Sequence, residues 1–188
     1  TSDNGEKSTF SEFKDKITEL QSSGMSKMII DLRDNPGGVL DEACNMADMI
    51  LPEGIITYTE TKSGKRTDYN SDAESLDIPI VILINENSAS ASEVFTGALK
   101  DYGKATVVGK KSYGKGIVQS VLPFYDGSGM SLTVAKYYTP NGTCIHGIGI
   151  EPDVEVDMPD EYKDMYASMV EHDKDTQLQK AIEIIKEK

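Results

Sequence analysis

The sequence predicts a single α/β domain, and three observations lead to that fold class. Up to about Gly116, short runs of β-branched residues alternate with segments whose apolar residues recur at helical spacing. Beyond Gly116 the pattern changes to two stretches with strand character, separated by a turn that contains glycine. The 188 residues are enough for one ordinary domain with a hydrophobic core, and no internal repeat divides them.

The elements before Gly116 are indicated by caps and turns as well as by periodicity. A helix is predicted to begin at Thr9, with Glu12 in the capping-box position, and to stop at Gly24. The segments that follow are a strand at 28–32, a helix at 40–51, a hairpin that opens with a strand at 55–59 and leads into a polar stretch at 68–75, a strand at 79–85, a helix at 90–100 and a strand at 105–108. The strand at 79–85 has an unbroken apolar run, so we expect it in the centre of a sheet that is covered on both faces.

Two strands and a final helix are expected after Gly116. The strands at 117–122 and 130–138 are joined by a turn at 126–129 and should form an antiparallel pair. The last helix begins at about Asp175 and should dock on the body of the domain through one apolar face. This face consists of Leu178, Ala181, Ile182 and Ile185.

The charge balance excludes some classes of function. The chain has 19 basic and 32 acidic residues, which gives a net charge of −13. Because nucleic-acid affinity depends mainly on Lys and Arg, no nucleic-acid partner is expected. The last 38 residues, with 12 acidic and 5 basic side chains, contribute −7 of this total, which is typical of a solvated surface. The longest apolar run, residues 78–84, is far shorter than the roughly 20 residues that span a bilayer.

Cysteines and histidines are too few and too scattered for most metal sites. Cys44 and Cys144 lie 100 positions apart, so we expect two separate buried thiols and keep a disulfide as the alternative. A structural zinc site would have to gather both cysteines and both histidines, so neither a metal nor another cofactor is expected. His172 lies in a charged stretch and should be solvated. His146 is the candidate for a serine–histidine pair, although a hydrogen-bonded structural role is the preferred interpretation.

Three segments combine small residues, turns and a possible reactive group. The first is DLRDNPGG at 31–38, between a predicted strand and a predicted helix. Gly37 and Gly38 would let backbone N–H groups approach a ligand closely, and a helix start adds positive partial charge. Glycines in such turns are also common for steric reasons, so this segment alone indicates little.

The second segment is SASASE at 88–93, after the central strand and before a helix. Ser90 and Glu93 have the spacing of a capping box, which would stabilise the helix by about 1 kcal/mol. A serine in that turn would also lie exposed at the carboxyl end of the strand. The next backbone N–H would then face any oxyanion that the serine creates.

The third segment is KSYGKGIVQ at 111–119, in which Lys115 lies between two glycines. A lysine that is withdrawn from water can lose its proton near neutral pH and act as a general base. If the intervening residues form a strand, the even spacing puts Gln119 on the same face as Lys115. An ordinary surface lysine in a glycine turn is the alternative interpretation.

In this order the three segments resemble the motifs of the carboxyl-terminal processing (tail-specific) serine proteases. YYTPNG at 137–142 and IHGIGIEPD at 145–153 are also similar to the family pattern, and the resemblance extends from about Phe10 to Asp153. Members of this family use a Ser/Lys dyad. The resemblance implies an α/β fold with a Clp protease/crotonase-like core of β-α units and additional antiparallel strands.

The resemblance also implies roles for individual residues. A lysine at its reference pKa of about 10.4 is protonated at neutral pH, so the base of the dyad would have to be buried away from carboxylates. The implied site consists of the nucleophile Ser90, the general base Lys115, the residue Gln119 that positions this base, the oxyanion-hole amides of Gly38 and Ala91, and a supporting Asp101.

The function implied by the resemblance is that of a serine-type endopeptidase that cleaves protein substrates near their C-terminus. Residues 1–188 would be a single catalytic domain excised from a longer chain with a PDZ domain. The expected partners are the C-terminal tails of proteins or peptides and the PDZ domain of the full-length chain, and a homo-oligomer is kept open. The family implies an extracytoplasmic location, in the cell envelope or periplasm, with a membrane anchor in the full-length protein.

Two other functions stay open at this point. One is a protease-fold interaction domain without catalytic turnover. The other is a crotonase-type acyl-CoA enzyme, whose chemistry would give no role to Ser90 with Lys115.

Overall fold

The computed structural model describes residues 7–188, which contain two four-stranded sheets. The first sheet is parallel, with strand order β1-β4-β5-β8. Its strands are β1 (Met28–Asp31), β4 (Ile80–Ile84), β5 (Ala105–Gly109) and β8 (Val154–Glu155). All five residues of β4 are buried between two neighbouring strands, which confirms the prediction of a central strand. With only two residues, β8 is too short for periodicity to indicate it.

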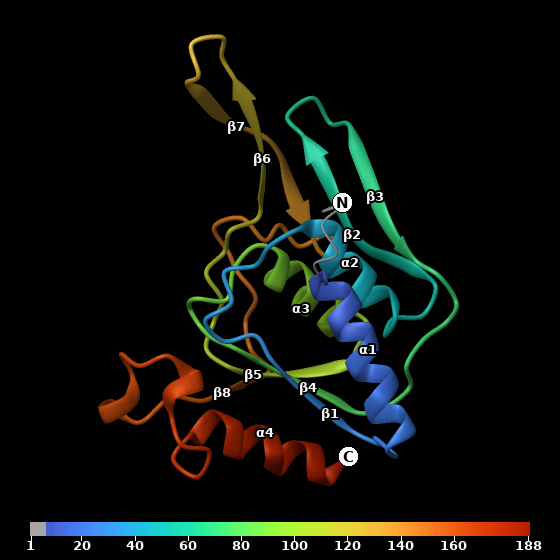
Figure 1. The fold of residues 1–188 in the computed structure, drawn as a ribbon, viewed down its shortest axis with the longest axis vertical. Coiled ribbons are helices and arrows are strands. Elements are labelled where there is room, and N and C mark those ends of the chain that lie inside the picture. Colours follow the sequence, from blue (N-terminus) through green and yellow to red (C-terminus); the bar gives the residue numbers. More distant parts are fainter. Residues whose placement is uncertain (1–6) are drawn as a thin grey trace.

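Helices cover both faces of the parallel sheet (Figure 1). On one face lie α1 (Thr9–Ser22), α2 (Leu40–Asp48) and α3 (Ala91–Asp101), and on the other lies α4 (Thr176–Glu187). The side chains of β4 alternate between the two faces, as the pleat of a strand requires. Ile80, Ile82 and Ile84 pack with α2 and α3, whereas Val81 and Leu83 pack with Val108, Ala181 and Ile185.

The second sheet is antiparallel, with strand order β3-β2-β7-β6. Its strands are β2 (Gly54–Thr61), β3 (Arg66–Ser71), β6 (Ile117–Pro123) and β7 (Gly129–Tyr138). The predicted antiparallel pair is confirmed as β6 and β7, and its hairpin extends away from the parallel sheet (Figure 1). The polar stretch predicted after the first hairpin is partly a strand, β3. Most of β3 is exposed at the sheet edge, so its sequence lacks an apolar period.

The helix ends lie close to those predicted. The helix α1 begins at Thr9 as predicted, but its N-cap is Ser8: the Ser8 backbone is extended, and its hydroxyl accepts a hydrogen bond from Ser11 N at 3.1 Å. The predicted start of α4 is confirmed, because the Asp175 carboxylate accepts a hydrogen bond from Leu178 N at 2.9 Å. Two short 3-10 helices precede α4, namely η1 (Asp160–Tyr162) and η2 (Ala167–Met169). No helix within residues 7–188 is long and apolar enough to cross a membrane.

Candidate active site

Ser90 occupies a strained turn between β4 and α3. Its φ is +57° and its ψ is −118°, values that residues with side chains rarely adopt. The other non-glycine residue with positive φ in the described part of the chain is Asp34, in the segment that faces this turn. Strained residues of this kind persist only when the surrounding structure holds them, and they cluster at functional sites. A serine between a buried strand and a helix N-terminus also has the context of a nucleophile elbow.

Glu93 connects the Ser90 turn to the segment that carries Lys115. Its side chain is 1% exposed, and its Oε2 accepts hydrogen bonds from Ser90 N and Lys115 N, both at 2.8 Å. Its Oε1 accepts from Gly114 N at 2.7 Å and from the Ser112 hydroxyl at 2.5 Å. The predicted bond from Glu93 back to the Ser90 N–H is therefore present. The other three contacts are not evident from the sequence, since they join segments about 20 residues apart.

The 31–38 segment, which follows β1 and which we call the glycine loop, packs directly against the Ser90 turn. Ala89 N donates a hydrogen bond to the Asn35 carbonyl at 3.0 Å, and Gly37 N donates to Asn35 Oδ1 at 2.9 Å. Gly37 has φ +87°, and a Cβ there would lie 2.5 Å from Ala89 O and 2.7 Å from Ala91 N. Only glycine fits this position, so the contact between the two turns depends on it.

Gly38 and Ala91, the two residues expected to form an oxyanion hole, line one cavity beside Ser90. Within residues 7–188, neither backbone N–H donates a hydrogen bond to another residue. Ala91 is the first residue of α3, where the helix dipole adds to the positive potential. The two amides thus share a cavity, and their convergence on Ser90 Oγ stays a prediction.

This cavity has a volume of about 270 Å³ and is mainly apolar. It lies between the glycine loop and the helices α2 and α3, and the polar residues that line it are Thr9, Asn35, Glu42 and Ser92. The apolar side chains that line it are Leu32, Val39, Ala43, Met46, Ala91 and Phe95. A space of this size and polarity suits one apolar side chain of a peptide.

Lys115 and Gln119 lie where the sequence places them along the chain, but both side chains are exposed. The expectation that Lys115 is buried is wrong in this structure. In the part of the chain that the structure describes, its amine forms no hydrogen bond or ion pair, whereas its backbone N–H is held by Glu93. The predicted alternation from Lys115 to Gln119 also fails, because β6 begins only at Ile117 and its pairing shifts register between Val118 and Gln119.

Asp101 lies at the end of α3 that is farthest from Ser90. With 11 residues at about 1.5 Å each, the helix separates the two ends by roughly 16 Å. Asp101 Oδ2 accepts a hydrogen bond from Asn141 N at 2.9 Å and so joins α3 to the turn after β7. In this structure Asp101 makes a structural contact that is remote from Ser90, and its supporting role in catalysis stays a prediction.

The histidines and cysteines are placed mostly as expected. His172 is exposed and both thiols are free, with Cys44 buried and Cys144 half-buried, so the disulfide alternative is wrong. Burial, together with the nearby Asp41, raises the pKa of Cys44 to about 12, which makes this thiol unreactive. His146 is exposed instead of structurally hydrogen-bonded, and its backbone packs against Gly116, next to Lys115.

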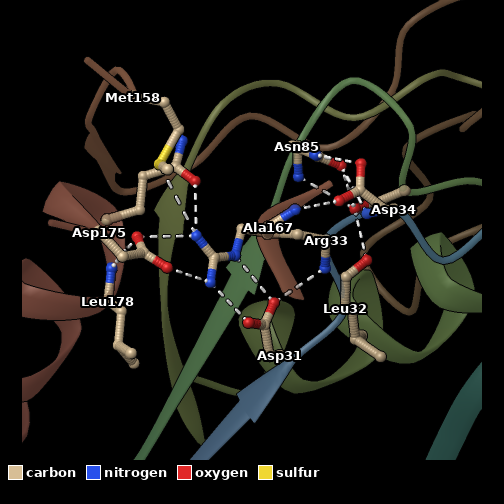
Figure 2. Close-up of polar contacts among 11 residues, drawn as sticks. Asp31, Leu32, Arg33, Asp34, Asn85, Met158, Ala167, Asp175 and Leu178 are labelled. Carbon is tan, nitrogen blue, oxygen red and sulfur yellow. Dashed lines mark hydrogen bonds and ion pairs between the residues drawn. The ribbon is translucent and has the colours of Figure 1, made fainter. Parts of the chain in front are cut away.

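Arg33 in the glycine loop is the centre of a buried ionic network that sequence reasoning misses (Figure 2). Its side chain is 2% exposed and forms paired hydrogen bonds with two carboxylates, those of Asp31 at 2.9 and 2.6 Å and those of Asp175 at 2.9 and 2.7 Å. Gln177 Oε1 accepts a further bond at 3.1 Å. Burial lowers the pKa of Arg33, but the bonds to the two carboxylates outweigh it, so the pKa is raised above its ordinary value.

Asp34, the next residue of the glycine loop, is also held by several hydrogen bonds (Figure 2). Its Oδ1 accepts hydrogen bonds from the side-chain amides of Asn85 at 2.8 Å and Asn87 at 2.9 Å. Its Oδ2 accepts from Ala167 N at 2.8 Å, and its own N–H donates to Asn85 Oδ1 at 2.9 Å. The loop is thus fixed both to the turn that precedes Ser90 and to η2.

Comparison with known proteins decides the family. A model of "Peptidase family S41" matches residues 3–156. The chain belongs to peptidase family S41. The sequence-based prediction of a serine peptidase (hydrolase) domain is thereby confirmed at the level of the family, and the acyl-CoA alternative is set aside. The S41 match ends before residues 157–188, which contain η1, η2 and α4.

Relatives of this S41 domain are named as proteases of the predicted kind. A CtpA-like serine protease of Staphylococcus aureus (strain COL) is 49% identical over 156 residues, which are 80% of this chain and 31% of the relative. The Staphylococcus epidermidis protein of the same name is 46% identical over 80% of this chain and 32% of its own length. The chain therefore spans about a third of the length of these relatives.

Solved structures agree with the fold. The photosystem II D1 C-terminal processing protease has a TM-score of 0.75 and 38% identity, covering 80% of this chain and 40% of its own. A lipoprotein from Streptococcus agalactiae has a TM-score of 0.70 and covers 96% of this chain and 63% of its own, but at 18% identity it supports the fold alone. The mixed α/β architecture predicted from the sequence is confirmed.

Proposed function

We propose that this domain is the catalytic part of a serine endopeptidase that cleaves protein substrates near their C-terminus with a Ser/Lys dyad. The observation that carries the proposal is the buried Glu93 carboxylate, which binds the backbone of both Ser90 and Lys115 through one oxygen atom. A single side chain thereby holds the backbones of the proposed nucleophile and the proposed base on adjacent segments.

In the proposed reaction, Ser90 Oγ attacks the carbonyl carbon of the scissile peptide bond and its proton passes to the neutral amine of Lys115. The oxygen that becomes negative accepts hydrogen bonds from Gly38 N and Ala91 N. Lys115 then gives the proton to the leaving amine, and the C–N bond breaks. A water molecule, deprotonated by Lys115, then attacks the carbonyl carbon of the acyl–enzyme. The bond between this carbon and Ser90 Oγ breaks, and Lys115 returns the proton to Ser90 Oγ, which restores the free enzyme.

The amine of Lys115 has to be withdrawn from water before it can act as a base. Its backbone is fixed by Glu93, so rotation of the side chain is enough to change its surroundings. We propose that a bound substrate, together with Gln119, covers the amine. Within the described residues no carboxylate pairs with the amine of Lys115.

The apolar cavity beside Ser90 supports a preference for an apolar substrate residue immediately before the scissile bond. Full burial of a medium-sized apolar side chain contributes about 1.5–3 kcal/mol, which is enough to select such residues. The recruitment of C-terminal tails by a PDZ domain, an extracytoplasmic location and a homo-oligomer remain predictions for the full-length protein.

The experiment that tests the function is active-site labelling with a fluorophosphonate, followed by mass mapping of the modified residue. We expect labelling at Ser90, none in Ser90→Ala, and cleavage of peptides whose residue before the scissile bond is Ala, Val or Leu. A Ser90→Ala protein that cleaves like the wild type would contradict the assignment of the nucleophile. A folded wild type that neither labels nor cleaves would favour the alternative of a non-catalytic interaction domain.

A further inference from the structure

We propose that Asp175, at the start of α4, is a positioning residue for the glycine loop and acts on the oxyanion hole through Arg33. The inference rests on the proposed function, because it assumes that Gly38 N is an oxyanion donor. It gives a role in the reaction to residues 157–188, which lie beyond the S41 match.

The contact between Asp175 and Arg33 is rigid and dry. Both side chains are 2% exposed, and the two groups meet through two parallel hydrogen bonds (Figure 2). Asp31 binds the guanidinium in the same paired manner, and Gln177 takes a further donor. A planar guanidinium with carboxylates on two edges cannot rotate without breaking several charge-assisted bonds at once.

A second contact from the same segment fixes the next loop residue. Ala167 N, in η2, donates to Asp34 Oδ2 at 2.8 Å. Residues 33 and 34 are thus both held from the side of residues 157–188, while Asn85 and Ala89 hold the loop from the side of the Ser90 turn. The loop is clamped between these two sides.

The clamp lies close enough to the proposed donor to set its position. Gly38 follows Arg33 by five residues, and the chain between them is constrained at Asp34 by a positive φ and at Gly37 by the close contact with Ala91. Few backbone torsions between Arg33 and Gly38 are therefore free to change, so a displacement of Arg33 should also displace Gly38. An error of about 1 Å in a catalytic group can cost roughly 100-fold in rate.

Asp175 also caps α4, so its variants must separate this structural role from positioning. Asp175→Asn keeps an oxygen that can accept from Leu178 N, but it removes the charge and one of the two acceptors for Arg33. Ala167→Pro removes only the N–H that binds Asp34. Proline fits there, because Ala167 is the first residue of η2 and Tyr166 before it is extended. Asp173→Asn, an exposed change two residues from Asp175, is the matched control.

The test compares three measurements, each made well below the unfolding temperature of the variant. They are the rate of Ser90 labelling by a fluorophosphonate, kcat and KM on a peptide substrate, and hydrogen exchange of the backbone amides at 32–38. We expect Asp175→Asn to lower the labelling rate and kcat by about 10- to 100-fold with little change in KM, because an oxyanion donor acts mainly in the transition state. Exchange in the loop should become faster. Ala167→Pro should give the same changes to a smaller extent, and Asp173→Asn should give none.

Three results would overturn the inference. They are an Asp175→Asn protein that is labelled at the wild-type rate, faster loop exchange without slower labelling, and an Asp173→Asn protein that is equally impaired. If the wild type fails to label, the proposed function fails, and the exchange data still decide whether Asp175 holds the loop.

Discussion

Ser90 and Lys115 are joined through a single oxygen atom, because Oε2 of the buried Glu93 carboxylate accepts the backbone N–H of each residue at 2.8 Å. Carboxylates commonly accept several backbone N–H bonds at turns, but here the two turns come from different parts of the chain. The backbones of the proposed nucleophile and the proposed base are therefore held at a common distance from one side-chain oxygen.

Replacement of Glu93 should impair both stability and activity. In Glu93→Gln one acceptor oxygen becomes an NH2 donor, which faces backbone N–H groups or the Ser112 hydroxyl. We expect the free energy of unfolding to fall by about 1–3 kcal/mol and the fluorophosphonate labelling rate to fall by about tenfold or more. Denaturant titration and labelling kinetics measure the two effects. Glu86→Gln, at an exposed position, is the control, and equal losses in both variants would contradict this role of Glu93.

Substitution of the proposed base should abolish turnover. Lys115→Ala and Lys115→Arg should both be as inactive as Ser90→Ala, because dyad members act as a unit and a guanidinium stays protonated. Gln119→Ala should be milder, since it removes orientation and not the proton acceptor. Peptide hydrolysis in the full-length enzyme is the measurement, with the exposed Lys111→Arg as a control. Turnover by Lys115→Arg would refute the dyad and turn attention to His146, whose backbone packs beside it.

Gly37 and Gly24 offer a matched test of the contact between the glycine loop and the Ser90 turn. Both have φ +87°, but a Cβ on Gly37 would clash with Ala89 and Ala91, whereas nothing lies within 4 Å of one on Gly24. Gly24→Ala should lose about 1 kcal/mol from backbone strain alone and keep its activity. Gly37→Ala should lose a further 1–3 kcal/mol, about the cost of overpacking, and most of its activity. Thermal unfolding and labelling rates decide, and equal behaviour of the two variants would show that the contact is unimportant.

Asp34 should make the stability depend on pH in the acid range. Burial works to raise its pKa, but the hydrogen bonds from Asn87, Ala167 and Asn85 outweigh it and hold the pKa below the ordinary value of 3.8. Its contribution to stability is therefore complete above pH 3.8 and is lost as the pH falls through the folded-state pKa. Asn tolerates the positive φ of this position, so Asp34→Asn should fold and show a shallower loss of stability below about pH 4. Urea titrations between pH 2.5 and 6 measure this, and identical slopes for both proteins would exclude Asp34 as the titrating group.

The parts of the fold that are predictable from the sequence are those with strong local signals. The apolar run at 79–85 indicates a central strand, and the turns at Gly24 and at 126–129 end their elements as expected. The polar strand β3 has no such signal because it is mostly exposed at the edge of its sheet, beside β2. The strand β8 has none because it is only two residues long and pairs with β5, which is distant in the chain.

The candidate site is predictable in its residue types but not in its contacts. Motif order leads to Ser90, Lys115 and the glycine loop, yet three of the four bonds to Glu93 and the pairing of Arg33 with Asp175 depend on tertiary packing. Arg33 and Asp175 are 142 positions apart. Local sequence patterns also cannot predict that Lys115 is exposed, because the residues that could cover its side chain are brought there by the fold as a whole.

Because the side chains of β4 alternate between the two faces of the sheet, the position at which the domain is truncated for expression decides whether both faces stay covered. Val81 and Leu83, together with Val108, are covered by Ala181 and Ile185 of α4. A shortened chain that stops where the S41 match stops, at residue 156, would keep every proposed catalytic residue and strip the cover from one whole face of the parallel sheet. Such a truncated protein would present an apolar surface to water, and it should aggregate or bind hydrophobic dyes even though its motifs are complete.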